Sequence, residues 1–132
     1  MAELLKVEGV SKKFVSVSGL FKRQYTVVSA VDNVSFSVSE GETFGLVGES
    51  GSGKTTVARI ALGLESASAG RVLVEGVDVS SLKGSGLKEL RKRMGVVFQD
   101  PASSLNPRAT IGQTLRRPLE VHGFSAKEMD MA

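Results

Sequence analysis

Eight consecutive residues near the middle of the chain combine glycine, hydroxyl and lysine side chains at a spacing suited to phosphate chemistry. They are, in order, Gly48-Glu49-Ser50-Gly51-Ser52-Gly53-Lys54-Thr55. Glycine lets a backbone take positive φ and curl around an anion, so that successive N–H groups point inward. In the pattern Gly-x-x-x-x-Gly-Lys-Thr, the lysine reaches the β- and γ-phosphates and the threonine hydroxyl can ligate Mg²⁺. The pattern therefore predicts a loop that binds the phosphates of a nucleotide.

A strand should lead into this loop and a helix should follow it. The segment Thr43–Val47 is short and almost wholly apolar, which predicts a strand buried on both faces. From Thr55 to Leu64 the apolar residues recur at helical spacing. The start of that helix would offer unpaired N–H groups and the positive end of its dipole to the anion. We therefore expect residues 48–55, together with Thr56, to hold ATP with Mg²⁺.

Other β segments are expected on both sides of the loop. Before it, strands are predicted at Leu4–Val10, Tyr25–Ala30 and Val34–Val38, the last from strict alternation. The segment Ser16–Gln24 indicates a loop. After it, Arg71–Val74 and Val77–Val79 around Glu-Gly predict a hairpin.

The last third of the chain alternates between predicted helices and loops. Leu87, Leu90 and Met94 have the spacing of one face of a basic helix. Gly95–Phe98 predicts another short apolar strand. The remaining elements are a structured loop over Asp100–Arg108 and a helix over Thr110–His122, kinked or interrupted at Pro118 and ended by Gly123.

Composition agrees with one ordinary globular domain. The chain has 132 residues, of which 41% are hydrophobic and 23% charged, so disorder is not indicated. The absence of cysteine excludes disulfides and cysteine-based zinc sites. No apolar run approaches the length of a membrane helix and the N-terminus has no signal-peptide core. We therefore expect a cytoplasmic protein without a transmembrane segment of its own.

Four stretches together resemble a known family. They are Ala30–Phe36 with Gly41-Glu42, Gly45–Thr56, Val97–Pro101 with Ser104–Arg108, and Thr110–Gly112 with Pro118-Leu119 and His122-Gly123. The chain resembles the ATPase subunits of ABC transporters, and within them those that drive oligopeptide, dipeptide or nickel uptake in prokaryotes. The third stretch is the most specific, because other P-loop classes have nothing like it.

The resemblance implies a fold class and a boundary. The fold would be an α/β P-loop NTPase of the ABC ATPase type, with an antiparallel β subdomain and part of a parallel core. Residues 1–132 would form the N-terminal part of a nucleotide-binding domain. The family's Leu-Ser-Gly-Gly-Gln signature, its Walker B Asp with catalytic Glu, and its switch His have no match in the printed sequence. We therefore expect a chain truncated before these motifs that binds ATP with little or no hydrolysis.

The resemblance also implies roles for individual residues. Gln99 matches the glutamine of the Q-loop, which implies contact with Mg²⁺ or the attacking water. An amide suits that role because it orients water and ligates a metal without titrating. The implied catalytic residues are thus Lys54 and Gln99, and the implied metal ligands are Thr55 and Gln99. Phe14 matches an aromatic that stacks on adenine, with Tyr25 as its rival.

Partners follow from the same likeness. The loop from Gln99 to Arg108 would face the transmembrane permease subunits, and a second ATPase subunit would pair with this one. The implied function is ATP binding, and in the intact family ATP hydrolysis, that powers import of peptides or related small solutes. The implied location is the inner face of the cell membrane.

Two alternatives remain open at this point, and two others are disfavoured. The chain could bind nucleotide without turnover, or belong to a phosphonate-processing complex, whose ATPases look similar here. Another P-loop enzyme is disfavoured, because a GTPase would show Asn-Lys-x-Asp and the sequence has none. The basic cluster Lys83, Lys88, Arg91, Lys92 and Arg93 lacks interleaved aromatics, so we expect a solvated helix face rather than nucleic-acid binding.

Overall fold

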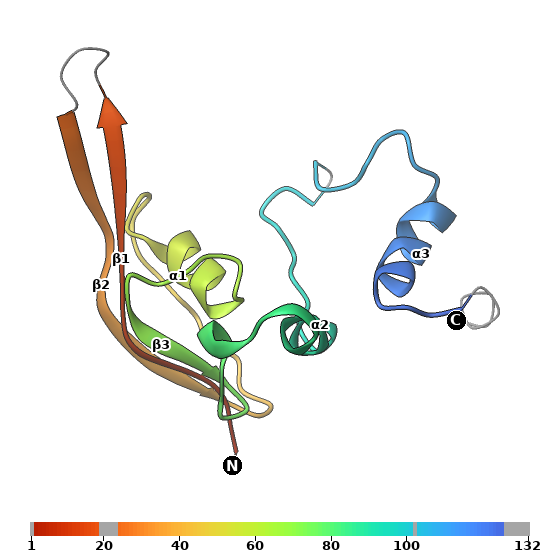
Figure 1. Cartoon of the computed structure of the whole chain (residues 1–132), viewed down its shortest axis with the longest axis horizontal. Helices are drawn as coiled ribbons and strands as arrows, with labels where there is room; N and C mark the ends of the chain where they lie inside the picture. The colour runs from red at the N-terminus through yellow and green to blue at the C-terminus, as the bar shows by residue number, and fades with distance from the viewer. Residues whose placement is uncertain (1, 19–23, 102, 126–132) are drawn as a thin grey trace. The chain divides into compact units, whose positions relative to one another are not determined.

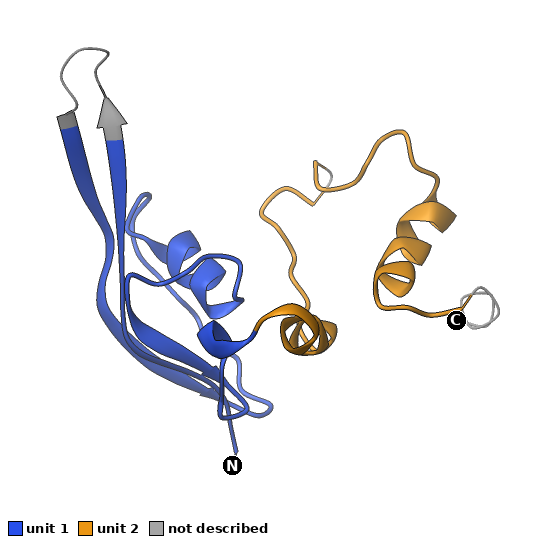
Figure 2. Cartoon of the chain, in the orientation of Figure 1, with its two compact units in different colours: residues 1–82 blue, residues 83–132 orange. Residues whose placement is uncertain are grey.

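The computed structural model describes residues 2–18, 24–101 and 103–125. The chain divides into two compact units, residues 1–82 and residues 83–132 (Figure 2). The first unit holds an antiparallel sheet with one helix, and the second holds two helices joined by a long loop.

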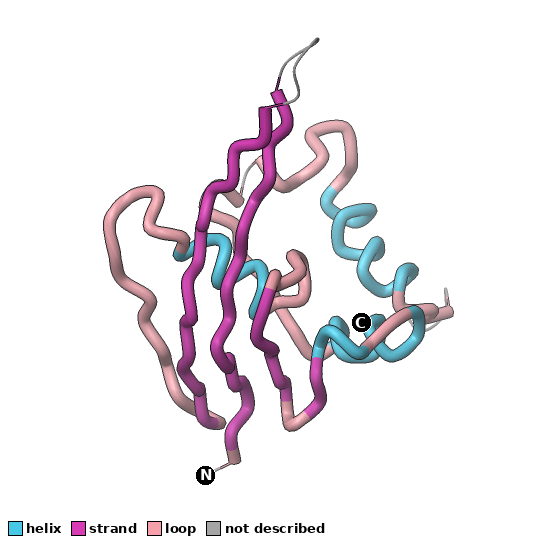
Figure 3. Tube along the Cα trace, turned by 60° about the vertical axis from the view of Figure 1, so that its left-hand side comes forward, coloured by secondary structure: helices cyan, strands magenta, loops and turns pink. Residues whose placement is uncertain are grey.

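The sheet of the first unit is built on one long hairpin. Strand β1 (Glu3–Ser18) pairs along its length with β2 (Gln24–Ser39), and its other edge pairs with β3 (Ala69–Val74). The short β4 (Val77–Asp78) completes the order β2-β1-β3-β4, and every pairing is antiparallel (Figures 1 and 3). The predicted antiparallel part of the fold and the hairpin after the loop are confirmed.

The strands predicted before the glycine loop were shorter than the strands in the structure. The segments around Leu4–Val10 and the two segments over Tyr25–Val38 belong to single strands of sixteen residues each. Of the loop expected over 16–24, residues 19–23 lie outside the described residues, and the flanking residues continue the two strands. Pairing across the hairpin therefore extends further than local alternation indicated.

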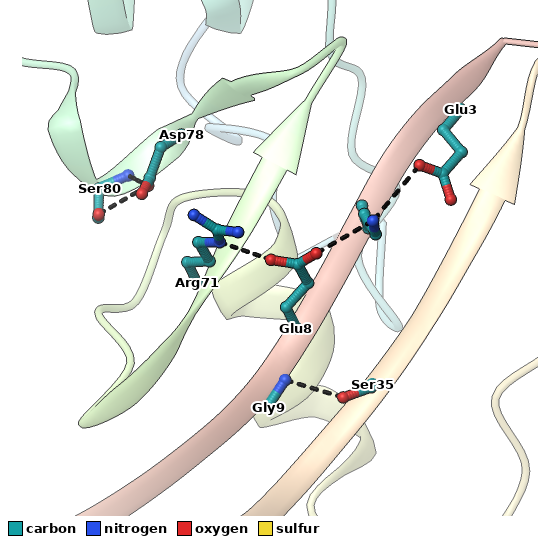
Figure 4. A network of polar contacts seen from close by, with 8 residues as sticks. Glu3, Glu8, Gly9, Ser35, Arg71, Asp78 and Ser80 are labelled. Carbon is teal, nitrogen blue, oxygen red and sulfur yellow. Dashed lines mark hydrogen bonds and ion pairs between the residues drawn. The ribbon is translucent and has the colours of Figure 1, made fainter.

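The pairing of β1 with β2 is irregular between Val7 and Lys13, where the register shifts. Gly9 has φ 58°, and its N–H donates to Ser35 Oγ at 2.8 Å (Figure 4). The N–H of Asn33 donates to Ser11 Oγ at 2.9 Å. A Cβ on Gly70 would lie 2.4 Å from the Gly9 carbonyl oxygen, so only glycine fits this approach. The serine hydroxyls satisfy backbone donors that the shifted ladder leaves unpaired.

One helix covers a face of this sheet and closes the core. Helix α1 (Lys54–Ala61) buries Val57, Ile60 and Ala61, which confirms the predicted helix after the glycine loop. The other buried apolar side chains of the first unit are Val7, Val10, Val31, Val72, Val74 and Val79. Val79 opens the short 3-10 turn η1 (Val79–Ser81), which Asp78 caps by accepting from Ser80 N at 2.8 Å.

Ion pairs tie neighbouring segments of the first unit together. Glu8 on β1 accepts from Arg71 on β3 and pairs with Lys6 at 3.1 Å (Figure 4). Lys12, only 8% exposed, donates to Glu65 Oε1 at 2.6 Å and to the Ser66 carbonyl oxygen at 2.7 Å. The contacts of Lys12 with Glu65 and Ser66 hold the loop after α1 against β1.

The two short apolar strands predicted over Thr43–Val47 and Gly95–Phe98 are not formed, and both predictions were wrong. Val47 is 95% exposed and Val97 is 87% exposed. A strand is stable only when neighbouring strands take up its backbone hydrogen bonds, and the described sheet places none beside either segment. The expected parallel core therefore has no paired strands among the described residues.

The second unit contains the two predicted helices. Helix α2 (Gly84–Lys92) buries Leu90, and α3 (Ile111–Val121) begins at a capping box formed by Thr110 and Gln113. Helix α3 continues through Pro118, so the proline does not interrupt it.

The loop between these helices is structured, as predicted. Asp100 organises its first turn: Oδ1 accepts from Ser103 N at 3.3 Å, and its carbonyl oxygen accepts from Ser104 Oγ at 3.1 Å. Arg108 N donates to Asn106 Oδ1 at 3.0 Å. Over the described residues, the chain has no helix both long enough and apolar enough to cross a membrane.

We predict that stability falls in acid through Glu8 and Glu65. Hydrogen bonds from Arg71 and Lys6 lower the pKa of Glu8, and a hydrogen bond from Lys12 lowers the pKa of Glu65. A lowered pKa in the folded state stabilises it above the ordinary carboxyl pKa, and this contribution is lost as the pH falls through the lowered value. Urea unfolding measured between neutral and strongly acidic pH should show this loss.

The variant Glu8→Gln/Glu65→Gln should be less stable at neutral pH and have a flatter acid profile. Glu40→Gln, which changes an exposed carboxylate in the turn after β2, serves as the control. Parallel pH profiles for the double variant and the unchanged chain would contradict this assignment.

Candidate phosphate-binding site

The glycine loop curls as its sequence predicts. Gly51 has φ 80° and Gly53 has φ 91°, a left-handed conformation that is strained for any other residue. Ser52 N donates to the Glu49 carbonyl oxygen at 3.2 Å and closes the turn. Glu49 and Ser50 are exposed on the loop.

The end of the loop is pressed against the sheet. A Cβ added to Gly53 would lie 2.2 Å from the Ala30 carbonyl oxygen on β2 and 3.5 Å from Val31 Cγ2. Across the loop, a Cβ on Gly48 would lie 2.7 Å from Ser52 Oγ. Close packing against backbone therefore requires glycine at position 53, in addition to its backbone conformation, whereas at Gly48 the serine side chain would have to move.

Helix α1 begins directly after this contact. Val57 N donates to the Gly53 carbonyl oxygen at 2.9 Å, the first bond of the helical ladder. The N–H groups of Lys54, Thr55 and Thr56 precede that bond and have no partner one turn back. No acidic side chain lies in the first turn. The helix start therefore offers donors and positive potential to an anion.

Lys54 lies over the same loop. Its Nζ donates to the carbonyl oxygens of Gly48 at 2.7 Å and Glu49 at 2.5 Å, and lies 3.3 Å from Ser52 Oγ. An ammonium has three donors, and here each has an acceptor on the loop. Phosphate oxygens are stronger acceptors for an ammonium because the hydrogen bond is charge-assisted. The lysine is thus held at the loop, where it can exchange these contacts for an anion.

Phe14 and Tyr25 lie on opposite faces of the hairpin. Phe14 pairs with Val28, and Tyr25 is three residues from Val28 in a stretch of unbroken register. Successive side chains of a strand alternate in face, so an odd separation places Tyr25 on the other side. Lys12 Nζ lies 5.1 Å from the centroid of the Phe14 ring and also binds Glu65, which follows α1. Phe14 therefore shares the face of the sheet that α1 covers.

For Thr55 and Gln99, the remaining predicted site residues, the structure gives exposure but no side-chain hydrogen bond to the glycine loop. Thr55 is exposed in the first turn of α1, which suits a hydroxyl that ligates a metal. Gln99 is exposed and belongs to the second unit. Its contact with the loop, and the Mg²⁺ site shared with Thr55, stay predictions.

Two features of this region escaped the sequence analysis. The contact of Gly53 with Ala30 joins residues far apart in the chain, and no local pattern signals it. Lys12 stands in a Lys-Lys pair that resembles a solvated surface, yet it is among the most buried side chains. The one sequence feature that pointed to a special environment for Lys12 is Phe14, an aromatic residue two positions later on the same strand.

The comparisons with known proteins point to one family. A family model described as "ABC transporter" matches residues 31–132. The probable peptide ABC transporter ATP-binding protein y4tS of Sinorhizobium fredii is 51% identical over 117 residues, which are 89% of this chain and 33% of that protein. The oligopeptide transport ATP-binding protein AppF of Bacillus subtilis is 45% identical over 122 residues, 92% of this chain and 37% of that protein. The chain thus spans about a third of the length of the curated relatives it matches.

Solved structures agree with the fold. The ATP-binding cassette MJ0796, in a dimeric post-hydrolysis state bound to ADP and Pi, matches with a TM-score of 0.75 and 27% identity over 96% of this chain and 53% of that one. A second dimeric structure of the same bacterial ABC transporter cassette matches with a TM-score of 0.75 and 26% identity over the same shares. The predicted fold class, a P-loop ATPase of the ABC type, is confirmed.

We predict that Gly53→Ala disrupts the loop. The new Cβ would overlap the Ala30 carbonyl oxygen, and the left-handed backbone alone costs a non-glycine residue about 1–2 kcal/mol. The free energy of unfolding, measured in urea, should fall by more than this amount. Gly45→Ala is the matched control, since its Cβ would meet nothing within 4 Å. Equal unfolding midpoints for the two variants would refute the close approach of Gly53 to β2.

Proposed function

The chain belongs to the ABC transporter family, and from this we propose that it binds ATP through residues 48–56, as the ATP-binding subunit of a peptide importer. The observation that carries the proposal is the start of α1: Gly53 in a left-handed conformation, the first-turn N–H groups of Lys54 to Thr56 after it, and Lys54 Nζ over the loop. This arrangement meets each need of a polyphosphate at a helix N-terminus.

Different residues of the loop would bind different parts of the polyphosphate. The N–H groups of Lys54, Thr55 and Thr56 donate to the phosphate oxygens, and Lys54 Nζ neutralises the charge toward the terminal phosphate. A bound Mg²⁺ would supply further charge neutralisation, and the exposed hydroxyl of Thr55 fits it as a hard oxygen ligand. Gln99 is the second proposed ligand, and with Lys54 it forms the proposed catalytic pair.

Phe14 is the proposed platform for adenine. It is 43% exposed and shares the face of the sheet that α1 covers. The strand pairing therefore favours Phe14 over Tyr25, which lies on the opposite face. A π-face stacks on any base, so Phe14 would add affinity more than selectivity.

Binding and turnover are separable in this chain. Hydrolysis requires a positioned water and stabilisation of the charge that develops in the transition state. The printed sequence holds no match to the family's Walker B carboxylates or signature. We therefore propose that residues 1–132 bind ATP without sustained hydrolysis, and that intact relatives couple hydrolysis to transport.

The partners are proposed from the relatives. The names of y4tS and AppF point to peptide or oligopeptide transport, which needs permease subunits in the membrane. The exposed loop from Gln99 to Arg108, rigidified by Asp100 and Asn106, is the proposed contact with them. A second ATPase subunit is proposed because the MJ0796 cassette is dimeric. These partners would hold the chain at the inner face of the membrane.

We predict that Lys54→Ala weakens binding of a fluorescent ATP analogue with Mg²⁺ by about tenfold or more, since a charged hydrogen bond is lost. Lys13→Ala, which removes a lysine from an exposed strand position, should bind like the unchanged chain. Phosphate release followed in the same samples should stay at background. Binding that survives Lys54→Ala would contradict the assignment of the loop, and steady turnover would contradict the separation of binding from hydrolysis.

We also predict that Phe14→Leu weakens ATP binding by about fivefold or more, because stacking of a base on an aromatic contributes about 1–3 kcal/mol. Tyr25→Leu, an aromatic lost from the opposite face, should have little effect. Inorganic tripolyphosphate competes for the loop alone, so its affinity should be unchanged in both variants. A larger effect of Tyr25→Leu than of Phe14→Leu would reverse the choice between the two rings.

A further inference from the structure

Lys12 is a buried charge held by a carboxylate, a carbonyl oxygen and an aromatic ring. Its side chain is 10% exposed and its Nζ binds Glu65 Oε1 at 2.6 Å and the Ser66 carbonyl oxygen at 2.7 Å. Removing an ammonium from water is costly unless charge and hydrogen bonds replace the solvent. A valine or leucine would pack at this position of β1 without the cost of desolvating a charge. Packing alone therefore does not explain why the residue is a lysine.

The same ammonium lies over an aromatic ring. Lys12 Nζ is 5.1 Å from the centroid of Phe14, within the range of a cation–π contact. This contact places both side chains on the same side of β1. The cation covers one face of the ring, while 43% of the phenylalanine remains exposed.

We propose that Lys12 is a positioning residue for the nucleobase, which acts by fixing and polarising the Phe14 ring from the face that its ammonium covers. The inference rests on the proposed binding of ATP by this chain and on Phe14 as its adenine platform.

Electrostatics explains why a cation behind the ring would help. The π-face of phenylalanine is negative, and so is the face of an electron-rich base, so two such faces repel when stacked directly. A cation against the far face offsets this negative charge and draws electron density away from the side that meets the base. The ammonium cannot drift from the ring, because Glu65 and Ser66 hold it.

The geometry also joins the two ends of the nucleotide site. Helix α1 begins at the phosphate loop, and the residues that hold Lys12 follow the helix at its other end. Ser68 extends the attachment: its N–H donates to the Ser11 carbonyl oxygen at 2.8 Å, and its Oγ accepts from Lys13 N at 3.0 Å. Helix α1 thus connects the phosphate-binding loop to the contacts that hold Lys12 against Phe14.

The test compares a ligand with a base and a ligand without one. The affinities of MgATP and of inorganic tripolyphosphate would be measured for the unchanged chain, Lys12→Met, Lys12→Arg and the exposed-site control Lys13→Met. We expect Lys12→Met to weaken MgATP by about two- to fivefold, the range of a cation–π contact. Tripolyphosphate should be unaffected, and Lys12→Arg should retain most of the MgATP affinity because a guanidinium also lies over aromatic rings.

A second comparison asks whether Lys12 acts through the ring. In a Phe14→Leu background, Lys12→Met should bring no further loss of MgATP affinity, since the platform is already gone. Equal losses in the two backgrounds would overturn the inference, as would equal weakening of MgATP and tripolyphosphate, which is the mark of a merely structural lysine.

Two further outcomes are also decisive. If Lys12→Met fails to fold, Glu65→Gln loosens the ammonium without removing it and should show the same split between the two ligands; no split there overturns the inference. If the unchanged chain binds neither ligand, the proposed function itself fails. If it binds both and no Lys12 or Glu65 variant alters their ratio, only the positioning role fails.

Discussion

The backbone of Gly53 lies against the carbonyl oxygen of Ala30, with no room between them for a side chain. That contact sets where the glycine loop ends and where α1 begins. Because Gly53 also takes φ 91°, the chain turns sharply enough for the next three N–H groups to face outward from the helix start. The buried residues Val57 and Ile60 then hold α1 on the sheet. The proposed anion site therefore depends on packing between a loop and a strand as well as on the charge of Lys54.

The antiparallel sheet supports both ends of the proposed site. Strand β2 supplies the carbonyl oxygen beneath Gly53, and β1 carries Phe14 and Lys12 on the face that α1 covers. The bulge around Gly9, stabilised by Ser11 and Ser35, lets the long hairpin bend without leaving backbone donors unpaired.

Two apolar segments behave differently from the rest. Thr43–Val47 and Gly95–Phe98 have the composition of strands buried on both faces, yet both are largely exposed and unpaired among the described residues. In the first, the Phe44 ring stacks on Phe36 of β2 at 4.7 Å between centroids. Side-chain hydrophobicity favours burial of such segments, but a strand also needs neighbours for its N–H and C=O groups.

The sequence alone determined the local structure. The glycine spacing predicted a tightly curled loop, the period of Val57 and Ile60 predicted α1, and Thr110 with Gln113 begins a helix as capping residues do. These features depend on residues within one or two turns of each other. Tertiary structure decided what the sequence left open: which aromatic faces α1, why Lys12 is buried, and whether the two apolar segments become strands. Each of these depends on contacts between residues distant in the chain, and on backbone partners that no single segment can supply for itself.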